Sequence, residues 1–127
     1  MLTPISILYG TVAHGKGLGA SMGMPTANLT CPAAALPPCG VYTSLVLISE
    51  KQYLAVTNIG PRPTVDNDTH VTVEAHILDF AGDLYDQKIT LICYERLRDT
   101  QGFASVEKLQ AQFARDCADT RAWYAQK

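Results

Sequence analysis

The chain has 127 residues, 47% of them hydrophobic, so it can bury one core without disulfide or metal staples. Ten Lys and Arg against 12 Asp and Glu give a net charge of −2, and nucleic-acid binding needs clustered positive charge that is absent here. No run approaches about 18 apolar residues, and the first residues do not resemble a signal peptide. We therefore expect one domain over residues 1–127, soluble and cytoplasmic, with no nucleic-acid or membrane partner.

The cysteines are spread along the sequence without a C-x-x-C pair and without a His at metal-binding spacing. We expect all of them to be reduced, ordinary thiols: Cys31, Cys39, Cys93 and Cys117.

Short runs rich in β-branched or alternating apolar residues are separated by Gly and Pro, which predicts strands. These runs cover residues 5–12, 41–48, 53–58, 71–78 and 88–96. No segment between them is long enough for a crossover helix, so neighbouring strands should pair antiparallel. The pattern favours an all-β curled sheet or barrel over a parallel α/β fold.

A glycine-rich stretch, residues 10–23, begins at the end of the first run and carries five glycines. Gly10, Gly15 and Lys16 come close to P-loop spacing, but Gly17 stands where Ser or Thr must hold Mg²⁺. The P-loop and a dinucleotide fingerprint also both need a helix here, which Pro25 disfavours. Backbone amides of such a loop can bind phosphate oxygens, and a ligand-free hairpin connection explains the glycines equally well. The residues alone leave these two interpretations open.

Thr26 and Asn28 alternate along an extended segment, so their side chains lie on one side of it, about 7 Å apart. A hydroxyl and an amide oxygen are suitable ligands for a nucleotide-bound Mg²⁺. Spacing alone nevertheless favours a turn in which both side chains satisfy local backbone groups.

Within the run 71–78, Glu74 and His76 share one face of the strand and the apolar residues share the other. A mid-strand Glu is unusual, because Glu is depleted in strands. Taken alone, this polar face is expected to meet water, with His76 solvated or hydrogen-bonded.

Ser105 is a suitable N-cap, and Glu107 places negative charge in the first turn of a helix. Residues at helical spacing then predict a helix of about residues 105–125. Its apolar stripe is expected to pack against a barrel of about residues 5–98. Arg115 and Arg121 fall off this stripe and can stay in water. The stripe consists of Val106, Leu109, Phe113, Cys117, Thr120 and Tyr124.

An ordered series of motifs across most of the chain resembles the riboflavin kinase family, whose members occur free-standing and as the kinase module of bifunctional bacterial FAD synthases. The resemblance implies a six-stranded antiparallel barrel with one C-terminal helix. It also implies transfer of the γ-phosphate of Mg-ATP to the ribityl 5′-hydroxyl of riboflavin, giving FMN and ADP. The motifs are Gly10-x-Val12, Gly23-x-Pro25-Thr26-Ala27-Asn28, Gly40-Val41-Tyr42, Asn58-Ile59-Gly60-x-x-Pro63-Thr64, Val73-Glu74-x-His76-Ile77, Asp83-Leu84-Tyr85, Leu97-Arg98 and Phe103-x-Ser105.

The same resemblance implies roles for individual residues. Thr26 and Asn28 would hold Mg²⁺ and the ATP phosphates, and Glu74 would be the catalytic base beside the flavin. Arg98 and Phe103 would lie near the flavin. The remaining nucleotide-binding positions are Gly15, Lys16, Gly17, Gly19, Gly23 and Pro25. Riboflavin or FMN and ATP or ADP would be the partners of a monomer, with no tightly bound organic cofactor.

One departure from the family concerns the loop. Members usually carry Arg or Lys at the position of Ala20, so we expect a high KM for ATP. Lys16 is the only basic residue in the loop that could take the place of that side chain. The competing hypothesis is a flavin-binding or flavin-sensing module that has lost catalysis. The chain is also short for an added adenylyltransferase module, so FAD synthesis is not expected.

Overall fold

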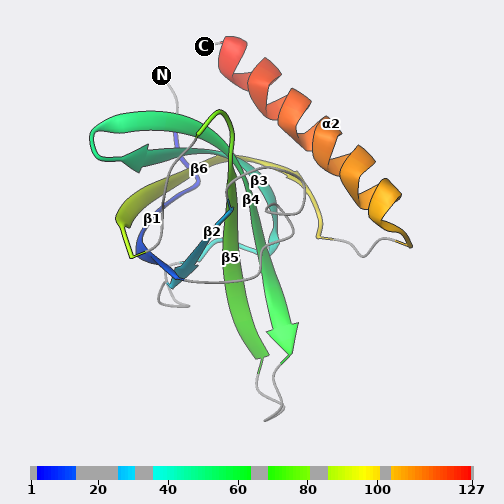
Figure 1. The fold of residues 1–127 in the computed structure, drawn as a ribbon, viewed down its shortest axis with the longest axis horizontal. Coiled ribbons are helices and arrows are strands. Elements are labelled where there is room, and N and C mark those ends of the chain that lie inside the picture. Colours follow the sequence, from blue (N-terminus) through cyan, green and yellow to red (C-terminus); the bar gives the residue numbers. More distant parts are fainter. Residues whose placement is uncertain are drawn as a thin grey trace.

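The computed structural model describes residues 3–13, 26–30, 36–63, 69–80, 86–100 and 104–126. Its elements are β1 (Ser6–Ala13), β2 (Thr26–Thr30), β3 (Gly40–Ile48), β4 (Lys51–Pro63), β5 (Thr69–Ile77), β6 (Lys88–Arg98) and α2 (Val106–Ala125). The strands form a closed barrel in the order β1-β2-β5-β4-β3-β6, with every pair antiparallel. Helix α2 lies along the outside of the barrel (Figure 1). The predicted fold, a six-stranded antiparallel barrel with one C-terminal helix, is confirmed.

Two strands differ from the predicted runs. The five-residue β2 was expected only as an extended segment, because its alternation of polar and apolar residues is too short to establish a strand by itself. Strand β4 continues to Pro63 and pairs with β5 up to Thr69, so the two strands extend past the rest of the barrel as a ribbon (Figure 1). The β3–β4 hairpin turns on Ser49 and Glu50, whose φ values of 48° and 70° suit the twist of a two-residue hairpin loop.

Alternation along the strands separates the core from the outer face. On β5, Val73, Ala75 and Ile77 point inward and are buried, as predicted, while Glu74 and His76 point outward. The interior is filled by aliphatic side chains from all six strands together with one tyrosine and one cysteine. Its members are Leu8, Val12, Ala27, Leu29, Tyr42, Val46, Ile48, Ala55, Ile59, Val73, Ala75, Ile77, Ile89, Leu91 and Cys93.

Helix α2 begins as predicted, because Ser105 is its N-cap and accepts a hydrogen bond from the Lys108 amide at 3.2 Å. It packs on a second apolar cluster on the outer face of the barrel. Thr43 of β3 and Thr120 of α2 join their hydroxyls at 3.1 Å between the two layers. The cluster comprises Val41, Val56 and Leu78 with Leu54, Leu97, Phe113 and Cys117.

The predicted apolar stripe of α2 is wrong at both ends. Val106 is 66% exposed and Tyr124 is 44% exposed, whereas Asp116 and Trp123 are buried. The first turn of α2 lies beyond the edge of the packed cluster, and three residues after Thr120 the helical repeat brings Trp123 to the barrel. Trp123 packs on Tyr94 of β6, with ring centroids 5.2 Å apart.

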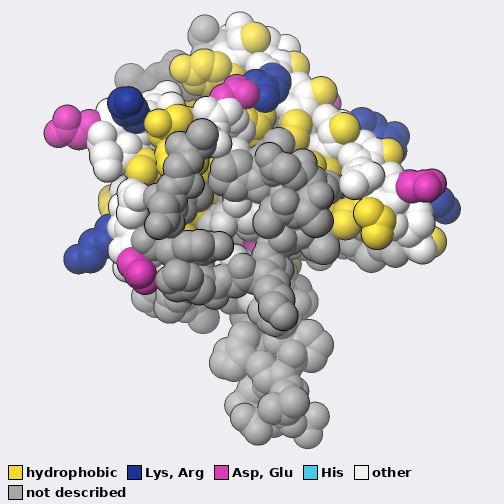
Figure 2. All heavy atoms as spheres, viewed as in Figure 1, with side chains coloured by type: hydrophobic (Ala, Val, Ile, Leu, Met, Phe, Trp, Pro, Cys, Tyr) yellow, Lys and Arg dark blue, Asp and Glu magenta, His cyan; other side chains and the backbone are white. Residues whose placement is uncertain are grey.

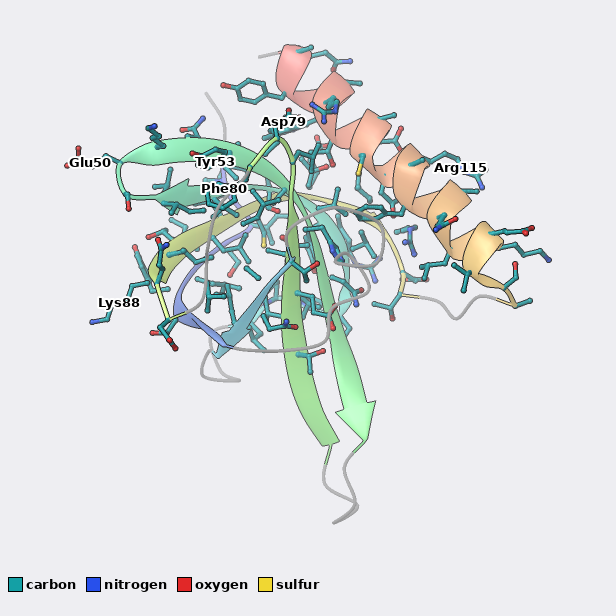
Figure 3. The ribbon with its side chains drawn as sticks, in the orientation of Figure 1. Glu50, Tyr53, Asp79, Phe80, Lys88 and Arg115 are labelled. Atoms are coloured by element: carbon teal, nitrogen blue, oxygen red, sulfur yellow. The ribbon has the colours of Figure 1, made fainter. Side chains whose placement is uncertain are left out.

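The charged residues that were expected to stay in water do so. Arg115 projects from the side of α2 that faces away from the barrel (Figure 3). Arg121 is exposed and forms an ion pair with Asp79 at 2.8 Å. Charges of both signs are scattered over the described surface seen in Figure 2, without a basic patch on that face.

Candidate active site

Three polar side chains lie next to one another across the outer face of the barrel. In the strand register, Glu74 of β5 stands opposite Asn28 of β2 on one side and Asn58 of β4 on the other. Side chains on directly opposite residues have Cβ atoms about 4.5–5.5 Å apart. The row continues through Val41 of β3 to Arg98 of β6. A carboxylate, two amides and a guanidinium therefore occupy one row across five strands.

The neighbouring row brings Thr26 opposite His76. The Thr26 Oγ1 and His76 Nδ1 atoms are 3.2 Å apart, within hydrogen-bonding distance. Phe113 of α2 covers the imidazole edge-on, with ring centroids 4.9 Å apart and an interplanar angle of 74°. His76 is only 7% exposed, so the expectation that this polar face meets water is wrong here. The helix supplies the cover that an isolated strand would lack.

Burial sets the protonation state of His76. It lowers the pKa of the imidazole from 6.5 to about 4, and the nearby Asp116 carboxylate opposes this only in part. His76 is therefore neutral near pH 7. A neutral imidazole has one nitrogen that donates and one that accepts a hydrogen bond.

This pKa predicts how the stability of the protein depends on pH. Between pH 6.5 and about 4 the unfolded chain binds a proton on His76 and the folded chain does not, so acid favours unfolding. From pH 7 to pH 5, this residue should lower the free energy of unfolding by about 2 kcal/mol. Urea denaturation of wild type and His76→Leu at both pH values measures the difference. Equal pH dependence in the two proteins would contradict the prediction. Asp116, whose carboxylate acts on the imidazole, and its ion-pair partner Arg98 remain in both proteins.

Arg98 joins the end of the site row to the helix. Its Nε donates to Asp116 Oδ1 at 3.1 Å and its Nη2 donates to Oδ2 at 2.8 Å. Gln112 Nε2 donates to the same carboxylate at 3.0 Å. The Asp116 side chain is 2% exposed and that of Arg98 is 22% exposed. This two-point ion pair fixes α2 on the barrel at the Arg98 end of the row.

A family model described as "Flavokinase: Riboflavin kinase" matches residues 3–124. The chain belongs to the riboflavin kinase family. It is 43% identical over 115 residues to the bifunctional riboflavin kinase/FMN adenylyltransferase of Pseudomonas fluorescens, and 41% identical over 118 residues to that of Escherichia coli K12. These matches cover 91% and 92% of this chain but 37% of each relative. An RNA-binding riboflavin kinase of Bacillus subtilis is 37% identical, over 88% of this chain and 48% of its own length.

Two solved structures share this riboflavin kinase fold. Riboflavin kinase from Trypanosoma brucei superposes with a TM-score of 0.67 at 26% identity, covering 92% of this chain and 78% of that one. A structure described as a macrolide-efflux protein from Streptococcus pneumoniae has a TM-score of 0.86 at 34% identity, covering 95% of this chain and 40% of that one. Within the described residues, no helix is long and apolar enough to cross a membrane.

The structure places only part of the site expected for a riboflavin kinase. It brings Thr26, Asn28 and Glu74 together on adjacent strands and puts Arg98 at the far end of the same row. Several predicted positions lie outside the described residues: Gly15, Lys16, Gly17, Gly19, Gly23, Pro25 and Phe103, together with Ala20.

Three residues of this region were not singled out for a role at the sequence level. Asn58 belongs to a quoted motif, but only the β4–β5 register places it beside Glu74. The contact of His76 with Thr26 requires the β2–β5 register, and the contact of Asp116 with Arg98 requires the docking of α2. Contacts between residues this far apart in the chain leave no local sequence signal.

The donor set fits magnesium. Thr26 and Asn28 offer a hydroxyl and an amide oxygen, and Mg²⁺ prefers such hard oxygen ligands with water or phosphate completing its shell. In the part of the chain that the structure describes, no three His, Cys, Asp or Glu side chains cluster as a metal site.

Proposed function

We propose that this chain is a riboflavin kinase, which transfers the γ-phosphate of Mg-ATP to the ribityl 5′-hydroxyl of riboflavin and produces FMN and ADP. The observation that carries the proposal is the position of Glu74, opposite Asn28 and adjacent to Thr26 on the outer face of the barrel. This position supports the proposal, because a carboxylate that can accept a proton lies beside the two side chains proposed to bind the metal. Membership of the riboflavin kinase family and the names of the relatives support the same activity.

In this proposal the protein contributes mainly position and charge, because phosphoryl transfer needs little covalent chemistry from the enzyme. Glu74 accepts a hydrogen bond from the ribityl hydroxyl and takes its proton as the new O–P bond forms. Thr26 and Asn28 would hold Mg²⁺, which, when bound, neutralises charge on the phosphates. The glycine-rich segment of residues 10–23, whose first four residues belong to β1, binds phosphate oxygens. Arg98 and Phe103 contact the flavin.

The partners in this proposal are riboflavin or FMN and ATP or ADP, and the protein acts as a monomer. We place it in the cytoplasm, which is supported by the cysteines of the described residues: Cys39, Cys93 and Cys117 form no disulfide. The chain spans little more than a third of the length of its bifunctional relatives.

Incubation with riboflavin, Mg²⁺ and each of several nucleoside triphosphates, followed by chromatography, tests the activity and the donor preference. We expect FMN to form, most efficiently with ATP. The alternative is a non-catalytic flavin-binding module on the same barrel. Quenching of flavin fluorescence without FMN formation would favour that alternative, because it shows an intact flavin site without turnover.

Removal of either proposed metal ligand should weaken nucleotide binding. We expect Thr26→Val and Asn28→Ala each to lower Mg-ATP affinity by about 10-fold, since loss of a hydrogen bond or ligand to a charged group costs about 1.5 kcal/mol. Calorimetry with Mg-ATP, and with ATP plus a chelator, measures this loss.

Thr90→Val is the matched control for these variants. It removes a hydroxyl from β6, which lies opposite β5 in the ring of strands, and should bind Mg-ATP like wild type. Unchanged affinity in both Thr26→Val and Asn28→Ala, with normal thermal melting, would remove these side chains from the nucleotide site.

A further inference from the structure

The contact between Thr26 and His76 links the proposed metal site to the helix. The Thr26 hydroxyl oxygen lies 3.2 Å from Nδ1 of an imidazole that is buried beneath Phe113. Because Phe113 fixes the ring edge-on from α2, Nδ1 has little freedom to turn away from Thr26. The contact joins β2, β5 and α2, which are distant in sequence.

A hydroxyl that binds a cation directs its oxygen lone pairs at the metal, so its hydrogen must point elsewhere and needs an acceptor. The Nδ1 lone pair of a neutral imidazole is such an acceptor. A protonated ring could only donate to Thr26, and it would place positive charge next to the metal.

We propose that His76 is a positioning residue: as the Nε2–H tautomer it accepts the hydrogen of the Thr26 hydroxyl and so orients the Thr26 oxygen toward the nucleotide-bound metal. The inference rests on the proposed function, to which it adds a role for α2 through Phe113. It also gives a reason for a polar ring beneath the helix. An apolar residue would fill the same space and leave the Thr26 hydroxyl free to rotate.

The tautomer can be measured in the ligand-free protein without reference to activity. Long-range ¹H–¹⁵N spectra distinguish the two imidazole nitrogens, and comparison with His76→Asn separates the His76 signals from those of His14 and His70. We expect Nδ1 to be unprotonated near pH 7. A proton on Nδ1 would overturn the inference, because the ring would then donate to Thr26.

Binding of Mg-ADP by calorimetry tests the consequence. Partners of metal ligands typically affect metal affinity by about 10- to 100-fold, so we expect His76→Leu to weaken Mg-ADP binding by about 10-fold. His76→Asn, whose amide oxygen can accept at the position of Nδ1, should remain within about threefold of wild type. Adding His76→Leu to Thr26→Val should cause no further loss, since His76 acts through that hydroxyl.

Thr43→Val is the matched control, because it breaks the hydrogen bond from β3 to Thr120 of α2 and leaves the site intact. We expect Thr43→Val to lose about as much stability as His76→Leu and still to bind Mg-ADP like wild type. Wild-type affinity in His76→Leu, with Thr26→Val impaired, would overturn the inference and leave the proposed function standing. If wild type shows no Mg-dependent nucleotide binding, the proposed function fails, and the tautomer still decides whether His76 accepts from Thr26.

Discussion

Glu74→Gln is expected to lower kcat by at least about 100-fold while riboflavin still binds, which is the usual size of a lost general base. The amide keeps the shape of the side chain and can accept a hydrogen bond, but it cannot take the proton of the ribityl hydroxyl. Glu74 stands between Asn28 and Asn58 in the strand register, and both partners can hydrogen-bond an amide as well as a carboxylate. The fold and the KM for riboflavin should therefore change little.

Glu95→Gln provides the same chemical change elsewhere in the barrel. Glu95 is an exposed residue of β6, opposite Thr43 rather than in the site row, so its variant should have wild-type kcat. Steady-state rates of FMN formation and flavin fluorescence titration of both variants separate turnover from binding. A kcat for Glu74→Gln within threefold of wild type would remove this carboxylate from the mechanism.

The fold was predictable because its signals are local. Alternation along β5 correctly assigns Val73 and Ala75 to the interior, and Ser105 correctly marks the start of α2. The six-strand count required the family resemblance, since β2 has only five residues and its alternation is too short to establish a strand by itself. The prediction for the two ends of the helical stripe was wrong. Helical periodicity predicts which face of the helix is apolar, but it does not predict where along the helix the contact with the barrel ends.

The candidate site was only partly predictable. Thr26, Asn28 and Glu74 were found through motifs, and the structure adds their arrangement on adjacent strands. Their partners depend on tertiary packing: His76 is polar in the sequence but buried by α2, and Asp116 looks like a surface residue of a helix. A charge at a helical position is read as solvent-exposed unless its partner on the barrel, here Arg98, is known.

Removal of Arg98 should destabilise the fold more than removal of its partner. Arg98→Met leaves the Asp116 carboxylate buried with a hydrogen bond from Gln112 but without its ion pair, and breaking a buried pair typically costs about 3–5 kcal/mol. Asp116→Asn should cost about 1–3 kcal/mol, because the Arg98 guanidinium is partly exposed and can turn toward water. Urea denaturation measures both values, and an equal or reversed order would contradict the argument.

The double variant Arg98→Met with Asp116→Leu separates the structural role of Arg98 from its proposed contact with the flavin. Replacing both members of a buried ion pair by apolar residues of similar volume is often neutral or stabilising, so most of the stability lost in Arg98→Met should return. Helix α2 would again be fixed on the barrel, now without a guanidinium at the end of the site row. If Arg98 contacts the flavin, riboflavin affinity stays low in the double variant although stability recovers. If affinity returns together with stability, Arg98 serves only to hold the helix, and its proposed flavin contact is wrong.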